Sequence, residues 1–315
     1  MDEKVILFYY KKTKERTMTL LHSHGTGGVV WEFFCEVILH GLTDTLKLLP
    51  FLFLTYILME FIEHRANGKV MSFMHKAGGF GPLIGGVLGA APQCGFSAAA
   101  SNLYTGGVVT LGTLIAVFLS TSDEMIPILI GGSIPPATVA VIVLYKTAVG
   151  VLCGFSVDLV LRLMHRDGRE INIDELCEND ECHCEKGILY SAVHHTVTIS
   201  LFVFLATVLI NAAVFFVGEE TLSSLFSFSP FLGYLFAALI GLIPNCASSV
   251  ILSTLCTEGI ISAGTMMSGL FTGAGVGLLV LFRVNKRVKE NVLIVLILLA
   301  FACVFGPLGD LIVKI

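Results

Sequence analysis

The sequence predicts an all-α integral membrane protein, an inverted-topology repeat with two re-entrant Pro-x-Cys helical hairpins and about ten helical segments. Three observations predict this class: the composition, apolar runs of membrane-spanning length, and a duplicated Pro-x-Cys segment. Of the 315 residues, 55% are hydrophobic and only 14% are charged, and the mean hydropathy is +0.86. Soluble domains carry about 25% charged residues, so lipid is the expected solvent.

The apolar runs divide the chain into two membrane parts, since one span needs about 20 residues. These runs are Leu48–Ile62, Gly79–Tyr104, Val108–Ile130, Ile134–Leu161, Ala192–Val217, Pro230–Leu255, Ile260–Phe282 and Asn291–Val313. The one long hydrophilic interior stretch is Arg162–Gly187. We therefore expect a polar N-terminal segment at 1–30, membrane repeat 1 at 31–161, a cytoplasmic loop at 162–190 and membrane repeat 2 at 191–315.

The two halves match each other without gaps at an offset of 152 residues. Residues 81–113 lie over residues 233–265, and the identical pairs include Pro92 with Pro244 and Cys94 with Cys246. Matched glycines lie on both sides of these pairs. An internal repeat of this kind predicts that the halves share one structure.

Loop charges orient the two halves. Basic residues cluster at 65–76, 162–186 and 283–289, whereas 218–229 contains no Lys or Arg. The positive-inside rule places the first three loops in the cytoplasm and the fourth outside. The Pro-x-Cys runs must then enter the membrane and return, and each half-run of about 11 to 14 residues is too short to span. We expect six crossings and two oppositely oriented hairpins.

The two hairpin tips form the first candidate site. Inverted-repeat transporters bind substrate near the midplane, where broken helices expose backbone groups. The substrate-binding candidates, which supply carboxamides, thiols and hydroxyls, are Gln93, Cys94, Ser97, Asn245, Cys246 and Ser249. Thiolates select soft or borderline metals and arsenic(III)-like species, and amide oxygens suit harder ions such as Mn²⁺. The alternative is that Pro-x-Cys only caps short helices and the thiol packs.

A pair of carboxylates, Asp123 and Glu124, interrupts the apolar run at 108–130. A charge at the bilayer centre costs about 2.5–3.5 kcal/mol on insertion scales. The pair is therefore expected to ligate a cation or to carry a coupled proton, the alternative being an interfacial loop end. Lys146, within the next span, is a candidate ion-pair partner for either carboxylate.

A stripe of ionisable residues precedes the first span. Glu32, Glu36, His40 and Asp44 are spaced by four, so they share one helical face. His40 and Asp44 are candidates for ion coupling, and so is Glu60 at the end of the span. The alternatives are an amphipathic interfacial helix and, for Glu60, a solvated helix end.

The hydrophilic loop holds a second set of metal-ligand types: Cys177, Cys182, His183 and Cys184. These side chains suffice for a tetrahedral thiophilic site, although the C-x₂-C spacing of structural zinc modules is missing. A metal sensor or delivery loop and an acidic linker both remain open. The nine cysteines are odd in number and five lie in apolar runs, so no disulfide framework is expected.

The sequence contains no Walker A, G-x-S-x-G or H-E-x-x-H motif. An enzyme is therefore not expected, and neither is a cofactor, apart from a divalent metal ion bound as substrate. The expected partners are the lipid bilayer and a metal or metalloid ion, with no nucleic acid, while a homodimer is left open. The expected location is the plasma membrane, crossed several times.

From about Asp44 to the C terminus, the chain resembles the ten-helix heavy-metal exporter family, whose members are labelled arsenic efflux proteins or manganese transporters. The resemblance is carried by PFLFLTYILMEFIEH, GAAPQCGFSAAASNLYTGGVVTLGTLIAVFLSTSDEMIP, CHCEKGI and GLIPNCASSVILSTL. It implies a metal or metalloid exporter. The chain is more distantly similar to arsenical permeases, but it has one cysteine per hairpin, which puts chelation by vicinal thiols in doubt.

The function expected from these patterns is secondary active export of a divalent heavy-metal ion, Mn²⁺ or similar, or of a metalloid by alternating access. Two rivals remain. A carrier of a small organic or anionic solute would use the hairpin helix N-termini as its anion site. A membrane metal sensor would be built around the loop at 177–184.

Overall fold

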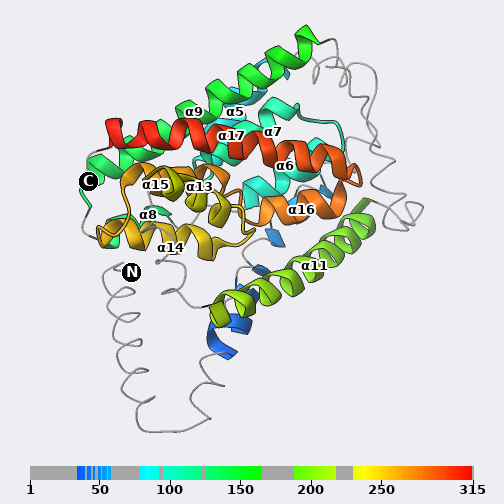
Figure 1. Cartoon of the computed structure of the whole chain (residues 1–315). Coiled ribbons are helices and arrows are strands. Elements are labelled where there is room, and N and C mark those ends of the chain that lie inside the picture. The colour runs from blue at the N-terminus through cyan, green and yellow to red at the C-terminus, as the bar shows by residue number, and fades with distance from the viewer. Residues whose placement is uncertain are drawn as a thin grey trace, which may run out of the picture.

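The computed structural model describes short pieces of residues 34–57 and the ranges 78–91, 95–122, 125–132, 134–164, 188–217 and 230–313. Throughout these ranges the regular elements are helices, and no strand occurs (Figure 1). Five stretches within them are long and apolar enough to cross a membrane: Leu111–Gly131, Pro136–Leu163, Ala192–Ile210, Ala263–Val284 and Val288–Ile312. The predicted class, a multi-helix membrane protein, is therefore confirmed. The predicted span Leu48–Ile62 lies largely outside the described residues.

Corresponding helices occur in the two halves. The first half contains α5 (Gly81–Gly89), α6 (Gly95–Thr105), α7 (Leu111–Ser120), α8 (Met125–Gly131) and α9 (Pro136–Leu163). The second half contains α13 (Pro230–Gly241), α14 (Cys246–Thr257), α15 (Ala263–Thr272), α16 (Val276–Val284) and α17 (Val288–Ile312). Before and between them lie η1 (Phe34–Leu39), η2 (Gly78–Phe80) and α11 (Ile188–Val217). In each half, one helix ends before the Pro-x-Cys segment and the next begins at or just after its cysteine (α5 and α6, α13 and α14). A second break divides the following span (α7 and α8, α15 and α16).

The turn after each Pro-x-Cys helix has the same backbone geometry. Gly107 and Gly259 both have φ +73°, and the N–H two residues beyond each glycine bonds back across the turn, from Val109 to Leu103 and from Ile261 to Leu255. Positive φ is costly for residues with a Cβ. Glycine is therefore required at both positions by conformation.

Replacing Gly259 by alanine is expected to destabilise the protein by about 1–2 kcal/mol, the cost of a left-handed L residue. No atom lies within 4 Å of the Cβ position, so no steric effect contributes. Thermal unfolding in detergent measures the change. Gly79→Ala is the control, because its Cβ would also meet nothing and no positive φ is recorded there. Equal melting temperatures for the two variants would contradict the conformational explanation.

Helices from opposite halves pack together. Helix α6 packs on α16, and α14 packs on α8. The first contact includes a hydrogen bond of 2.8 Å from Ser101 Oγ to the Gly277 carbonyl, and a Cβ at Gly277 would lie 2.7 Å from Ser97 Cβ. The two halves are therefore joined through the second helix of each Pro-x-Cys pair.

The outer helices carry exposed apolar side chains. Leu144 and Leu152 on α9, Leu209 on α11 and Leu311 on α17 are each at least 64% exposed. Lipid chains are as apolar as leucine, so an apolar side chain that faces lipid does not need to be buried in protein. Leucines this exposed on long apolar helices therefore indicate a surface in contact with lipid. The inner helices α7 and α15 are almost wholly buried, which places the protein core around them.

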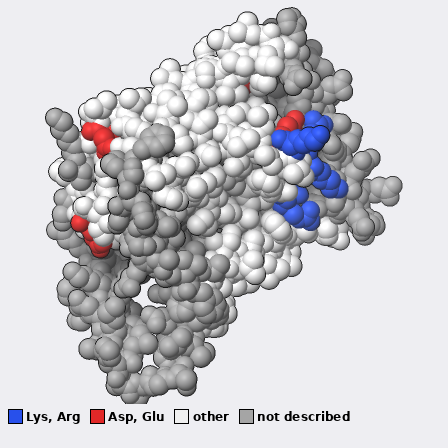
Figure 2. All heavy atoms as spheres, viewed as in Figure 1, with Lys and Arg blue, Asp and Glu red and all other residues white. Residues whose placement is uncertain are grey.

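The ends of the molecule differ in charge. Figure 1 shows α9 and α17 running in opposite directions, so α9 ends on the side where α17 begins. The described basic side chains gather on that side, near the connection between α16 and α17, and acidic side chains are visible at the opposite end (Figure 2). The stretch 283–289, which runs from the end of α16 to the start of α17, includes Arg283, Lys286, Arg287 and Lys289.

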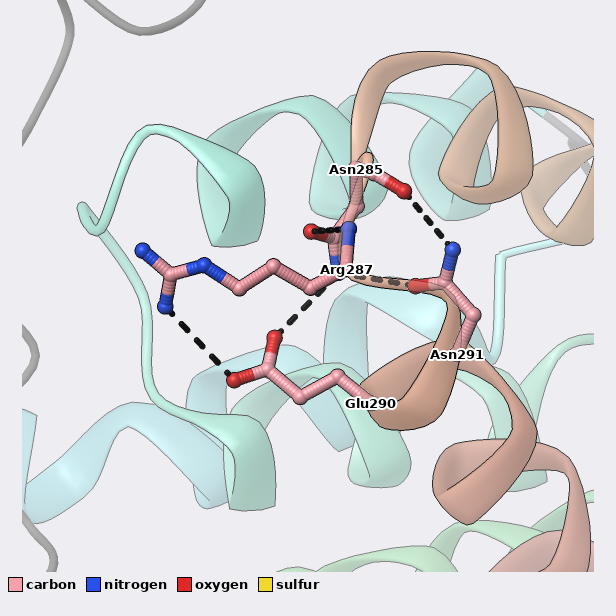
Figure 3. A network of polar contacts seen from close by, with 4 residues as sticks. All are labelled: Asn285, Arg287, Glu290 and Asn291. Atoms are coloured by element: carbon pink, nitrogen blue, oxygen red, sulfur yellow. Dashed lines mark hydrogen bonds and ion pairs between the residues drawn. The ribbon is translucent and has the colours of Figure 1, made fainter.

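Hydrogen bonds hold the basic connection in a defined turn (Figure 3). Asn285 Nδ2 donates to Asn291 Oδ1 at 2.7 Å, and Asn291 Nδ2 donates to the Asn285 carbonyl at 2.8 Å. Arg287 and Glu290 form an ion pair at 3.7 Å. The two buried asparagines thus fix the start of α17, while the charged side chains stay near the surface.

Candidate functional site

The helix interruptions of the two halves lie against the ends of neighbouring helices. In the first half, α5 ends at Gly89, where a Cβ would lie 2.6 Å from the Val117 carbonyl oxygen and would collide with Ser120 Oγ. In the second half, α13 ends at Gly241, where a Cβ would collide with the Gly269 carbonyl oxygen and with Thr272 Oγ1. Helices α5 and α13 therefore end beside the C-terminal ends of α7 and α15, respectively.

Hydroxyl groups at the ends of α7 and α15 donate hydrogen bonds to helix carbonyls. Ser120 Oγ donates to the Ala116 carbonyl at 2.7 Å, and Thr121 Oγ1 donates to the Val117 carbonyl at 2.7 Å. Thr272 Oγ1, at the position equivalent to Ser120, donates to the Ala238 carbonyl at 2.7 Å. The Val117 and Ala238 carbonyls also accept backbone N–H groups, from Thr121 at 3.0 Å and from Leu242 at 3.2 Å. The hydroxyls therefore add second hydrogen bonds to carbonyls near the ends of α7 and α13.

Lys146 connects the two helix ends. This lysine is fully buried in α9, and Nζ donates to the carbonyl of Thr121, directly after α7, and to the carbonyl of Leu270 in the last turn of α15, the latter at 3.0 Å. The cation therefore lies where two helix C-termini, one from each half, direct their negative dipole ends. The sequence suggested Asp123 or Glu124 as its partner, and both lie outside the described residues.

Four of the six predicted substrate-binding residues are described, and all are buried. Ser97 lies in the first turn of α6, where its Cβ and Oγ approach Gly277 of α16. Asn245 is the N-cap of α14, and Cys246 begins that helix. Ser249 Oγ donates to the Cys246 carbonyl at 2.8 Å. Gln93 and Cys94 lie outside the described residues.

Cys246 belongs to a cluster of buried apolar residues drawn from both halves. The cluster includes Ala98 of α6 and Val276 of α16. The second Pro-x-Cys segment is thus placed near the start of α6, the helix that follows the first Pro-x-Cys segment. Whether the two tips share a ligand remains a proposal.

The remaining predicted sites lie outside the described residues: the ion-coupling candidates His40, Asp44, Glu60, Asp123 and Glu124, and the loop residues Cys177, Cys182, His183 and Cys184. Among the described residues, no three His, Cys, Asp or Glu side chains lie close enough together to hold a metal ion.

Two carboxylates that received no role from the sequence form equivalent hydrogen bonds in the two halves. Asp158 in α9 accepts from Thr110 Oγ1 at 2.7 Å and from the Gly112 N–H at 2.8 Å. Asp310 in α17 accepts from Ser262 Oγ at 3.0 Å and from the Gly264 N–H at 2.6 Å. Asp158 and Asp310 are 152 residues apart, so the repeat offset was a signal that could have found them.

These carboxylates hold the N-termini of the inner helices. Thr110 caps α7 by accepting from the Thr113 N–H, and Ser262 caps α15 by accepting from the Thr265 N–H. A carboxylate at a helix N-terminus is stabilised by the positive end of the helix dipole. Each inner helix is therefore fixed at its N-terminus by the long helix of its own half.

A polar contact inside the membrane region was also not identified from the sequence. His195 of α11 is buried and stacks on Tyr56, with 5.2 Å between ring centroids. The Tyr56 hydroxyl donates to Asn102 Oδ1 of α6 at 3.3 Å. No periodic pattern in the sequence links His195 to Asn102.

The fold and the site together define a class, a multi-span helical membrane protein whose inner helices are interrupted at buried positions. Residues 35–196 match the family model ArsP_2, described as "Putative, 10TM heavy-metal exporter". This match covers slightly more than half of the chain, so the protein belongs to that family and the predicted resemblance is confirmed.

The other two comparisons give no relatives. No curated protein matches the chain, and no solved structure matches it.

Proposed function

We propose that the protein is a secondary active transporter that exports a divalent heavy-metal ion, Mn²⁺ or similar, or a metalloid across the plasma membrane by alternating access. The observation that carries the proposal is that one helix interruption from each half, at the ends of α7 and α15, lies at the buried Lys146. Interrupted helices inside a membrane are tolerated where they line a cavity or lie buried in protein. Family membership supports a metal as the substrate.

An inverted-topology repeat with two re-entrant hairpins is part of the proposal. Its support is the recurrence of helix bounds and hydrogen bonds at an offset of 152 residues, together with the opposite directions of α9 and α17 in Figure 1. The basic connection at 283–289 marks the cytoplasmic end under the positive-inside rule. In such folds, rocking of one repeat against the other exposes a central site to each side in turn.

The substrate would bind between the two Pro-x-Cys tips. Cys246 and Asn245 begin α14 as buried residues, and Cys94 and Gln93 are their counterparts in the first half. Two thiols and two amide oxygens form a donor set suited to a borderline metal ion or a trivalent metalloid. In the proposed cycle these groups would replace the hydration shell of the ion at the midplane.

The test is metal flux in proteoliposomes that contain the purified protein. Replacing Cys94 and Cys246 together by alanine is expected to lower metal flux by about 10-fold or more, the scale of losing groups that support metal affinity. The control is Cys153→Ala with Cys256→Ala, which removes two buried thiols placed elsewhere on α9 and α14.

The expected outcome is loss of flux in the first pair and flux within about twofold of wild type in the second. Wild-type flux in the Cys94 and Cys246 variant would remove the cysteines from the site. If the purified protein transports an organic anion but no metal ion, the metal proposal is overturned and the anion carrier is favoured.

A further inference from the structure

We propose that the carbonyls at the interrupted ends of α7 and α15 form a binding site for a monovalent cation, and that the ammonium group of Lys146 permanently occupies this site. The inference rests on the proposed function for its role in transport, but the site itself follows from the contacts alone. The ligand class is a small cation that accepts carbonyl coordination, such as a primary ammonium ion.

The Leu270 carbonyl is available because α15 ends two residues later, at Thr272. The N–H of Ala274, which would continue the helix, bonds instead to the Thr272 carbonyl at 2.8 Å. The Thr121 carbonyl follows the last residue of α7, and its backbone is extended, with ψ 127°. Each break therefore directs a carbonyl toward Lys146 Nζ.

The groups around this cation are of the kind that hold coupling ions in inverted-repeat transporters. There, unwound carbonyls and the C-terminal ends of half-helices coordinate Na⁺ or H⁺. Helix C-termini also favour a positive charge through their dipoles. Here a side chain of the protein supplies the charge, so the site is already filled when the chain folds.

Backbone carbonyls supply the described hydrogen bonds of this cation. Helices α5, α7 and α8 pack against α9, and α15 supplies the Leu270 carbonyl; none of these four helices carries an ionisable side chain among its described residues. At the equivalent position in the second half stands Leu298, which is buried and apolar. The site is therefore asymmetric, and the resident charge joins both halves through a single residue.

The site predicts a specific rescue experiment. Replacing Lys146 by alanine removes Cγ, Cδ, Cε and Nζ, the atoms that n-propylammonium supplies. The Lys146→Ala protein is expected to melt about 5 °C or more below wild type, because two buried carbonyls lose their donor. Adding n-propylammonium is expected to restore at least half of that loss, whereas 1-propanol, which fills the volume without the charge, is not.

Lys146→Met provides the matched control, because it keeps an unbranched side chain of similar volume, one atom shorter than lysine, and removes the charge. We expect it to be destabilised and not to respond to n-propylammonium. Metal flux in proteoliposomes should follow the same order: at least 10-fold lower in both variants and recovered by n-propylammonium only in Lys146→Ala. Wild-type transport should proceed unchanged when Na⁺ is replaced by choline, because the site is occupied.

The outcomes separate this inference from the proposed function. Absence of metal flux in the wild-type protein would overturn the transporter proposal, while the melting experiment would still test the cation site. Wild-type stability of Lys146→Met, or equal rescue of Lys146→Ala by 1-propanol, would overturn the cation site and leave the transporter proposal standing.

Discussion

Replacing Asp158 by alanine is expected to destabilise the protein by about 3–6 kcal/mol, since a hydrogen bond to a charged group contributes about 1.5–3 kcal/mol and two are lost. The side chain is only 7% exposed, so water does not readily replace it as an acceptor for Thr110 Oγ1 and the Gly112 N–H. The positive N-terminal end of α7 would also lose its counter-charge. Thermal unfolding in detergent measures the effect.

Two further variants make this prediction specific. Asp158→Asn keeps one acceptor oxygen for the Gly112 N–H and is expected to lie between wild type and alanine. Asp310→Ala removes the equivalent contacts and a hydrogen bond of 2.7 Å from the Tyr234 hydroxyl. Asp310 is more exposed than Asp158, so water can replace the lost acceptor and the effect should be smaller. A melting temperature for Asp158→Ala at the wild-type value would show that the carboxylate does not hold α7.

Replacing Gly241 by alanine is the second large effect, with an expected destabilisation of about 3 kcal/mol, at the upper end for overpacking a core. The new Cβ would lie 2.7 Å from the carbonyl carbon of Gly269. Backbone atoms of a buried helix cannot turn aside as a flexible side chain can. The end of α13 would therefore be pushed away from α15, and the Pro-x-Cys segment that follows would move with it.

Gly233→Ala is the matched control for this prediction. Gly233 lies in the same helix, but the nearest atom to its Cβ position is Thr265 Oγ1 at 3.8 Å, an ordinary contact. Melting temperatures and metal flux of the two variants are compared side by side. Gly241→Ala should lower both, and Gly233→Ala neither. The steric account fails if both variants behave alike.

The helix breaks could be predicted from sequence because their causes are local. Pro244 and the small residues around it disfavour a continuous helix wherever they occur, and duplication at a fixed offset displays the same signal twice. The element order around each Pro-x-Cys segment follows from such signals. The all-helical membrane class follows from composition, since long apolar runs leave few other solutions in lipid.

The partners of Lys146 could not be predicted, because backbone carbonyls have no residue signature. The sequence shows a lysine in an apolar run and a pair of carboxylates nearby, and an ion pair is the pattern-based expectation. The contacts of Nζ with Thr121 and Leu270 depend on where α7 and α15 end. The interruption at 273–275 is marked only by glycines, which are common throughout the chain.

Asp158 illustrates a different reason for a missed site. Its counterpart Asp310 lies at the repeat offset, and each pairs with a hydroxyl residue two positions before a glycine. That information was present in the sequence, but a carboxylate near a span end resembles an ordinary solvated helix end. Only the packing of each long helix against its inner helix distinguishes the two.

The packing of α6 on α16 has a consequence for biosynthesis. The hydrogen bond from Ser101 to Gly277 joins residues 176 positions apart. Helix α8 likewise packs against α14, which is synthesised much later. Contacts between distant parts of a chain are slow to form, and incompletely packed intermediates expose surfaces that aggregate. The first half therefore leaves the ribosome with the inner faces of α6 and α8 uncovered, and these faces become buried only after the second half is inserted.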